Sequence, residues 1–398
     1  MIRAAVSAVT ICLVASQPVL AADSRAIDRT WGAIEKQYRA DLKAEGVVGS
    51  AMMVSKDGKV LKTATYGLAD KDSARAVDAD TLYHWASITK LFTAVAIMQL
   101  RDRGKLSLDD RIVDYLPEFK QVHNPYGKMS DITLRHLLTH SSGMRAGTFP
   151  WRGDNDWAPH EPAKWSQVAA MMPYSQIEFQ PGSKFSYSNP GTSALGRVVE
   201  EITGDDIEGY ITKNILMPLG MTRSYFDTTP YYLSKHRSNN YYLMKGVLKA
   251  NGLEVETGAT NGNGGLNGPM SDLLKFAHFL LGVNDNGNYD SVLSHKTLEE
   301  MRQPLLEAGR DPALRERMGL STFVLDSTAP DGKTLQFIGH TGGQVGFTSF
   351  VYVQPDSRSA AIFAANTRNT DVARADTTFA KTRKALFEQI FPLLQKQK

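Results

Sequence analysis

The stretch HWASITKLF, residues 84–92, places Ser87 three positions before Lys90. Apolar residues recur at helical spacing, which predicts a helix that starts near Ser87 and stops near Gly104. They are Ile88, Leu91, Phe92, Val95 and Met98. One helical turn would bring the serine and the lysine to the same face. Ser87 is then either a nucleophile with Lys90 as its activator or only the cap of a buried helix, and the spacing alone leaves both open.

Outward from this stretch, both ends of the chain contain strand patterns. Residues 26–45 have an amphipathic helical repeat, and Lys56-Asp57-Gly58 then separates two β-rich runs, which is a strong hairpin signal. The C-terminal quarter holds four strand-like segments, LSTFVLDS, KTLQFIGH, FTSFVYVQ and SAAIFAAN, before a last helix over 375–390. We therefore expect an α/β (α+β) fold, with an antiparallel sheet built from both termini, flanked by helices, and a mainly helical second lobe.

The middle of the chain is expected to be helices and loops. LRHLLTH and TSALGRVVEEITG end in glycine-containing turns, and MSDLLKFAHFLLG is expected to begin with Ser271 as its cap and to end at Gly282. Two long irregular stretches, 145–162 and 222–262, are rich in aromatic residues. Loops of this length often shape a binding cleft.

The first residues, MIRAAVSAVTICLVASQPVLAADS, have a basic start, a short apolar run and small residues. This layout predicts a signal peptide over 1–22, cleaved after Ala21 or Ala22, and a protein that is exported, periplasmic or secreted. The run is too short to span a bilayer, so no stable membrane anchor is expected. The only cysteine, Cys12, lies in this segment and leaves the mature chain without a thiol. The mature domain would cover 23–398, with the helical lobe inserted at about 100–300.

The formal net charge of +3 is small for 398 residues, and no run of lysine and arginine stands out. The sequence therefore gives no sign of the basic patch that binds nucleic acid or an anionic membrane. A small molecule or a short peptide is the expected substrate.

Two further motifs follow Ser87 and Lys90 in the chain. PGSKFSYSNPG contains Tyr187-Ser188-Asn189, and FIGHTGGQVGF contains His340-Thr341-Gly342 at the end of an expected strand. This order of Ser-x-x-Lys, Tyr-x-Asn and a His-Thr-Gly variant of Lys-Thr-Gly resembles the serine β-lactamase and penicillin-binding-protein superfamily, in its class C-like branch. That branch includes D-aminopeptidases, D-alanyl-D-alanine carboxypeptidases, amide hydrolases and esterases.

The resemblance covers about residues 47–366, because several longer blocks occur in the family's usual order: GKLSLDDRIVDYLPEF, ITLRHLLTHSSGM, FQPGSKFSYSNPG and GGLNGPMSDLLKFAHFLL. It implies a β-lactamase/transpeptidase-like fold and a nucleophilic Ser87. A serine hydroxyl needs a neighbouring base, and a neutral Lys90 and Tyr187 are the two candidates. Asn189 would orient Lys90 and the substrate amide, or it would only be a turn residue before Pro190.

His340 takes the position of the strand lysine found in β-lactamases, and an imidazole offers a carboxylate less fixed charge than an ammonium does. This departure weakens the β-lactam interpretation. Thr341 and Gly342 complete the triplet in the expected substrate site. The backbone N–H groups of Ser87 and Gly343 are the expected oxyanion hole, and glycine at 342 and 343 would let the strand approach the scissile carbonyl closely.

Other patterns have competing explanations. His136 and His140 are four residues apart, which can suit zinc, but the glutamate of a His-Glu-x-x-His site is absent. NGNGGLNG opens no phosphate-binding motif and instead resembles the family's glycine-rich turn near the cleft. His84 beside Trp85 is expected to serve packing. No metal and no organic cofactor is implied.

The sequence therefore predicts an exported serine hydrolase that cleaves an amide or peptide bond through a Ser acyl-enzyme, including peptides with D- or non-standard residues. The alternatives are an esterase for small acyl esters and then a β-lactamase. A non-catalytic penicillin-binding or scaffold relative is the alternative of another class. The oligomeric state is not indicated by the sequence.

Overall fold

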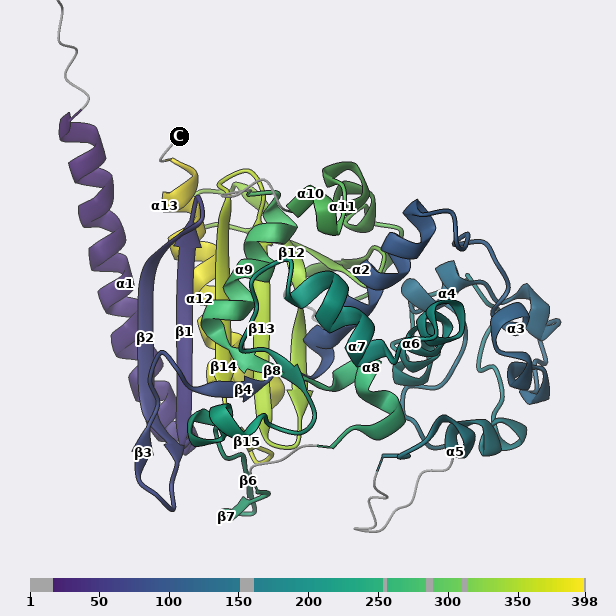
Figure 1. Ribbon diagram of the computed structural model, residues 1–398. Helices are drawn as coiled ribbons and strands as arrows, with labels where there is room; N and C mark the ends of the chain where they lie inside the picture. The colour runs from purple at the N-terminus through teal and green to yellow at the C-terminus, as the bar shows by residue number, and fades with distance from the viewer. Residues whose placement is uncertain (1–16, 151–160, 253–255, 284–288, 310–313, 397–398) are drawn as a thin grey trace, which may run out of the picture.

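The computed structural model describes residues 17–150, 161–252, 256–283, 289–309, 314–396 (Figure 1). Its centre is a nine-stranded sheet in which all neighbours are antiparallel. In spatial order the strands are β3 (Arg75–Ala76), β2 (Lys59–Asp70), β1 (Gly49–Lys56), β14 (Ser359–Ala365), β13 (Phe347–Gln354), β12 (Thr334–Gln344), β11 (Phe323–Thr328), β10 (Arg315–Met318) and β9 (Leu306–Glu307).

Both termini contribute to this sheet, as the sequence predicts. β1 pairs with β14 over seven residue pairs, from Ser50 opposite Ala365 to Lys56 opposite Ser359. The turn between β1 and β2 has positive φ at Asp57 (47°) and Gly58 (79°). These angles are those of a type I′ hairpin turn, whose twist matches the strands that it joins. The four expected C-terminal strands are confirmed as β11 to β14.

Alternate residues of the strands face two separate cores. On β13, Phe350 and Tyr352 belong to one core, and Val351 and Val353 belong to the other. This alternation is what the two-residue period of a strand produces when both faces of a sheet are covered. The central strands are therefore held by packing from both sides.

Helices from the two ends of the chain cover the first face. They are α1 (Gln17–Glu45), α12 (Thr378–Ala385) and α13 (Phe391–Gln395), with a short π-helical turn at Leu386–Ile390. The expected helix over 26–45 is confirmed as part of α1. Its apolar residues are buried in this core with those of the C-terminal helices: Ile27, Trp31, Ile34, Tyr38 and Leu42. α9 (Met270–Leu281) contacts β13 and β14 on the opposite face.

The second lobe is mainly helical and lies beside the sheet (Figure 1). Its helices are α2 (Thr89–Asp102), α3 (Ile112–Tyr115), α4 (Leu134–Leu138), α5 (Trp165–Ala170), α6 (Asn189–Thr203), α7 (Ile207–Ile211) and α8 (Asn261–Gly264). Two short helices, α10 (Tyr289–Val292) and α11 (His295–Met301), follow α9. Gly204 and Gly282 end α6 and α9 in the left-handed conformation, as expected.

Two expectations for this region are wrong. Ser271 lies inside α9, whose cap is Pro269, because β8 (Leu266–Pro269) leads directly into the helix. The stretch 222–262 is not wholly irregular. It contributes β5 (Tyr225–Phe226) to a sheet with β4 (Leu82–His84) and β8, and β6 (Tyr241–Met244) and β7 (Val247–Ala250) to a sheet with β15 (Thr367–Asn369). These strands are two to four residues long, which is too short to show the alternation of apolar and polar residues by which a strand is recognised.

The contact between β12 and the segment that carries Ser87 joins the sheet to the helical lobe. β11 pairs with β12 only as far as Gly339, so residues 340–344 extend beyond β11 and contact the 3-10 turn Ala86–Ile88. A Cβ atom at Gly342 would overlap the carbonyl oxygen of Trp85 and the hydroxyl of Ser349. Glycine at 342 is therefore required by this approach, whereas a Cβ atom at Gly343 would meet open space.

We predict that Gly342→Ala destabilises the protein by about 1–3 kcal/mol, because the added methyl group forces β12 away from Trp85. Gly343→Ala is the matched control and should change the free energy of unfolding by less than about 0.5 kcal/mol. Thermal and urea unfolding measure both. Equal effects of the two substitutions would contradict the close contact.

Candidate active site

Ser87 lies in the 3-10 turn Ala86–Ile88, directly before α2. Neither the turn nor α2 has a side-chain cap, so the Ser87 hydroxyl does not serve as a helix cap. Ala86 has a φ of +49°, which is strained for a residue with a Cβ atom. The side chain of Ser87 is half-buried and lines a cavity of about 420 Å³. The backbone thus presents the hydroxyl to a cavity rather than to its own helix.

Lys90 is fully buried on the first turn of α2, and its Nζ lies 3.2 Å from Ser87 Oγ. It also donates to the carbonyl oxygen of Asn263 at 2.8 Å and lies 3.4 Å from Asn263 Oδ1. Burial lowers the pKa of Lys90 well below its ordinary value, and the charge of Glu161 opposes this shift. A lysine in this setting can be a neutral amine that accepts a proton from Ser87.

The expected contact between Asn189 and Lys90 is not formed. The Asn189 N–H donates to Ala146, and its Oδ1 is buried with no hydrogen-bond partner among the described residues. Asn263 instead receives the hydrogen bonds of Lys90, and its amide donates to Ser193 Oγ at 2.7 Å. The sequence did not single out Asn263, although it lies in the glycine-rich segment NGNGGLNG that was expected near the cleft.

Tyr187 lies beside this pair and also lines the cavity. Lys90 Nζ is 5.1 Å from the centroid of the Tyr187 ring. The ring stacks on that of His140, with centroids 4.4 Å apart, and its centroid lies 6.1 Å from that of His340. The structure therefore brings Ser87, Lys90 and Tyr187 together, as the motif order implies.

His140 holds the Tyr187 segment at three consecutive residues. Its carbonyl oxygen accepts from the Ser186 N–H at 2.7 Å, and its Nδ1 accepts from the Ser188 N–H at 3.1 Å. Its ring stacks on the residue between them. Because Nδ1 is the acceptor, the ring proton of a neutral His140 belongs on Nε2. The stacking and both hydrogen bonds fix where the Tyr187 side chain points.

His340 lies beside Tyr187 but is not among the residues that line the cavity. Its side chain is fully buried, its Nδ1 lies 2.6 Å from the Thr341 carbonyl oxygen, and its ring centroid is 5.0 Å from that of Phe323. The next three residues, Thr341, Gly342 and Gly343, do line the cavity with Ser87. The position of the family's strand lysine thus offers no exposed cation to a ligand.

Glu161 is a further ionisable group near Lys90 that the sequence did not reveal. Its carboxylate accepts from Thr148 Oγ1 at 2.9 Å. Burial raises the pKa of Glu161, against hydrogen bonds from Thr148 and Thr260 and the charge of Lys90. Glu161 lies at the end of the stretch 145–162 that was expected to shape the cleft; its residues 151–160 lie outside the described part of the chain.

The other histidines have structural surroundings. His136 Nδ1 accepts from the Thr133 N–H, so the two histidines of the possible zinc pair bind different partners. His84 is fully buried between Asn267 and Gln344, and burial together with the charge of Arg237 lowers its pKa to about 4. No group of three or more potential metal ligands occurs in the described residues. Within the same residues, no helix has the length and apolarity needed to cross a bilayer.

Comparison with known proteins places the chain in a family. The Beta-lactamase family model matches residues 33–384, and the chain therefore belongs to the β-lactamase family, within the superfamily of class C β-lactamase-like and penicillin-binding-protein-like serine hydrolases. Its fold is the β-lactamase/transpeptidase fold.

Individual relatives show how far the likeness extends. The chain is 32% identical to Protein flp of Staphylococcus aureus over 203 residues, which is 51% of this chain and 39% of that protein. It is similar to the octameric penicillin-binding protein homologue from Pyrococcus abyssi, with 26% identity, a TM-score of 0.74 and coverage of 90% and 79%. A class C β-lactamase in complex with cefoxitin has the same fold, with 20% identity, a TM-score of 0.72 and coverage of 92% and 99%.

We predict that kcat/KM rises with pH as Lys90 loses its proton and reaches a plateau well below pH 10.5, the ordinary lysine value. Burial favours the neutral amine, which is the form that can accept a proton. A pH–rate profile with a neutral ester measures this. Lys90→Arg, whose guanidinium stays protonated, should lower kcat by about 10²- to 10⁴-fold. A rise centred near pH 10.5, or an active arginine variant, would contradict this role.

We also predict that His140 positions Tyr187 for catalysis. His140→Gln keeps a hydrogen-bond acceptor and His140→Phe keeps a stacking ring, and each should lower kcat by about tenfold to a hundredfold with KM changed by less than about threefold. Steady-state kinetics on a neutral ester measure the split between kcat and KM. His136→Gln, the matched histidine control, should leave both parameters near wild type. A loss confined to KM would rule out the positioning role.

Proposed function

We propose that the protein is an exported serine hydrolase that cleaves amide or peptide bonds, including those of peptides with D- or non-standard residues. The observation that carries this proposal is the 3.2 Å contact between Ser87 Oγ and the buried Lys90 Nζ at the cavity wall. No carboxylate forms an ion pair with Lys90 among the described residues, so burial is not offset by direct pairing. That setting supports a base rather than a structural cation.

In the proposed acylation step, Ser87 Oγ attacks the substrate carbonyl carbon and gives its proton to the neutral Lys90 amine. Negative charge forms on the carbonyl oxygen, which the N–H groups of Ser87 and Gly343 would stabilise. The carbon–nitrogen bond then breaks, and the leaving amine takes a proton from the Tyr187 hydroxyl. Lys90 returns its proton to Tyr187, and the acyl group stays on Ser87 as an ester.

Deacylation repeats these steps with water. Water attacks the ester carbonyl while its proton passes to the neutral Lys90 amine, and the ester bond to Ser87 Oγ breaks. Ser87 Oγ takes this proton back from Lys90, and the carboxylic acid product leaves. The two half-reactions need only water and residues of this chain, and Ser87, Lys90 and Tyr187 each end in the protonation state in which they began.

The choice of an amide or peptide substrate rests on the cavity and on the relatives. The cavity of about 420 Å³ is large enough for a short peptide terminus and has both polar and apolar walls. The similar protein from Pyrococcus abyssi is described as a penicillin-binding protein homologue. An esterase for small acyl esters uses the same chemistry and is the second candidate, and a β-lactamase is the third because His340 is buried.

Export and the N-terminal signal remain predictions of the sequence, because residues 1–16 lie outside the described part of the chain. The absence of a cofactor and the lack of affinity for nucleic acid are likewise part of the proposal.

Covalent labelling tests the proposed nucleophile. Incubation with a fluorophosphonate or a labelled penicillin, followed by mass mapping, should place the fluorophosphonate adduct on Ser87, and Ser87→Ala should lose both labelling and hydrolysis. Ser141→Ala changes a buried serine that does not line the cavity and is the control that should keep labelling. If neither probe labels Ser87 and the Ser87→Ala protein binds the same ligands, the protein is a non-catalytic relative.

A further inference from the structure

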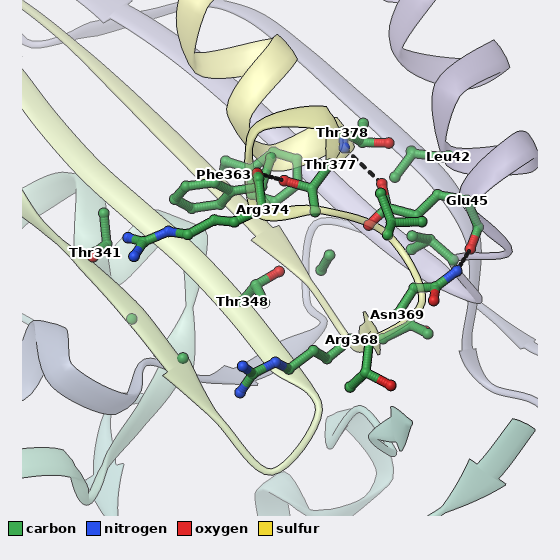
Figure 2. A pocket seen from close by; sticks show the side chains of 18 of the residues that line it. Leu42, Glu45, Thr341, Thr348, Phe363, Arg368, Asn369, Arg374, Thr377 and Thr378 are labelled. Atoms are coloured by element: carbon green, nitrogen blue, oxygen red, sulfur yellow. Dashed lines mark hydrogen bonds between the residues drawn. The ribbon is translucent and has the colours of Figure 1, made fainter. Parts of the chain in front are cut away.

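The two N–H groups of the expected oxyanion hole come from segments that are far apart in the chain. Ser87 lies in the turn before α2, and Gly343 lies near the end of β12. The end of β12 forms part of the cavity wall beside Ser87, and Thr341 marks it in Figure 2. The segment after β14 forms another part of the wall, where Arg368 and Arg374 are exposed. The two N–H groups keep their spacing only if the turn and the end of the strand are held together.

The ring of His84 joins these two segments. His84 is the last residue of β4, three residues before Ser87, and it is fully buried. Its Nε2 lies 3.2 Å from Oε1 of Gln344, the residue that directly follows Gly343. Its ring centroid is 6.0 Å from that of Phe347, which pairs with Gln344 across the turn between β12 and β13. One side chain of the Ser87 segment thus contacts both ends of the turn that follows Gly343.

The hydrogen bonds of Asn267 fix which nitrogen of His84 carries the proton. Asn267 Nδ2 donates to the Gly265 carbonyl oxygen at 2.9 Å, so Asn267 Oδ1 faces His84 Nδ1 at 3.0 Å and accepts from it. Burial and the charge of Arg237 lower the pKa of His84 to about 4, so the ring is neutral at neutral pH and Nε2 is an acceptor. A half-turn of the Gln344 amide exchanges its oxygen and nitrogen, and the NH2 group then donates to Nε2. His84 is therefore bonded to β8 on one side and to β12 on the other.

The Gln344 side chain also lies against the segment that holds Lys90. A Cβ atom at Gly264 would be 2.8 Å from Gln344 Oε1, so the amide passes directly over that glycine. Gly264 follows Asn263, whose carbonyl oxygen accepts from Lys90 Nζ at 2.8 Å. The half-buried amide of Gln344 therefore lies where three segments of the site meet: the strand before Ser87, the end of β12, and α8.

A strained residue lies close to each of the two expected donors. Ala86 directly precedes Ser87 and has a φ of +49°. Val345 directly follows Gln344 and has a φ of +42°, which is costly for a β-branched residue. Such conformations persist only where the surrounding structure holds them. The bond from His84 to Gln344 ties the two strained segments to each other.

We propose that His84 and Gln344 are positioning residues of the oxyanion hole, and that the hydrogen bond between them sets the distance between the N–H groups of Ser87 and Gly343. The proposal rests on the proposed function, because it requires an oxyanion to form at Ser87. Neither side chain lines the cavity, so both act through the backbone that they hold. Backbone donors stabilise an oxyanion only when they are placed for it, so a small shift of Gly343 should slow the reaction more than it weakens substrate binding.

Gln344→Met tests the proposal, because it removes the amide and keeps an unbranched side chain of similar length. With a neutral ester, kcat should fall about tenfold to a hundredfold while KM changes by less than about threefold. Phenylboronic acid forms a tetrahedral adduct with a serine nucleophile, and its affinity should fall by the same factor as kcat/KM. Unchanged kcat and unchanged boronate affinity would overturn the proposal.

Gln336→Met is the matched control on the same strand. Gln336 is exposed on β12, 3.5 Å from Asp326, and is not part of the cavity wall. Its substitution should leave kcat, KM and the boronate affinity near wild type. A loss equal to that of Gln344→Met would mean that any change on β12 slows the enzyme, which contradicts a specific role for Gln344.

His84→Phe tests the other end of the bond, because it keeps a ring beside Phe347 and removes both hydrogen bonds. Its kcat should fall as in Gln344→Met, and the double variant should lose little more than either single variant, because both changes remove the same bond. Losses that multiply in the double variant would show that the two residues act separately. If His84→Phe does not fold, the comparison of Gln344→Met with Gln336→Met decides.

Amide hydrogen exchange measures the positioning without turnover. Peptides that cover residues 340–347 should exchange about tenfold faster in Gln344→Met than in wild type, and no faster in Gln336→Met. If exchange rises and kcat does not fall, the bond holds the turn but not the oxyanion hole, so the proposal is wrong and the hydrolase stands. If wild type neither hydrolyses the ester nor is labelled at Ser87, the proposed function fails, and the role in the oxyanion hole fails with it.

Discussion

The approach of β12 to the Trp85 carbonyl is the contact on which the site depends. It joins a strand from the last quarter of the chain to a turn from the first quarter. Because Gly342 has no side chain, the strand can lie against the backbone that carries Ser87. Trp85 is held from the other side by its N–H bond to the Leu266 carbonyl at 2.9 Å. The serine is thus fixed between the sheet and β8, and the strain at Ala86 is maintained by these contacts.

Burial of Lys90 is the second constraint, and the helical lobe satisfies it. An ammonium without a carboxylate partner is costly in a dry environment, so the proton tends to leave. Asn263 and Ser87 supply hydrogen-bond acceptors to the amine, and Ser193 holds the Asn263 side chain. These residues come from α2, α6 and α8 and the turn before α2. The lobe therefore adjusts the chemistry of Lys90 while the sheet supplies the wall against which the substrate lies.

The sequence predicts those parts of this arrangement that are indicated by a short stretch of residues or by the order of motifs along the chain. The Asp57-Gly58 turn, the four C-terminal strands and the cluster of Ser87, Lys90 and Tyr187 have such signals, and the structure contains all of them. The prediction that Asn189 contacts Lys90 was wrong, and the amine bonds to Asn263 instead. The packing of α6 and α8 decides which asparagine reaches the amine. Burial of His340 and the place of Arg368 and Arg374 also depend on tertiary packing. No periodic pattern in the sequence around these residues indicates that packing.

The buried amine of Lys90 and the exposed guanidinium groups of Arg368 and Arg374 lie in different parts of the site. The two kinds of basic group suit different chemical tasks. A base needs a pKa near the working pH, whereas a group that anchors an anion must stay charged at every working pH. Lys90 meets the first need through burial, and an arginine meets the second without adjustment. A permanently charged lysine at position 340 would lie beside Tyr187, whose ring is also beside Lys90, and a like charge would lower the pKa of Lys90 further. With histidine there, the exposed cations of the cavity wall are Arg368 and Arg374, on the segment that follows β14.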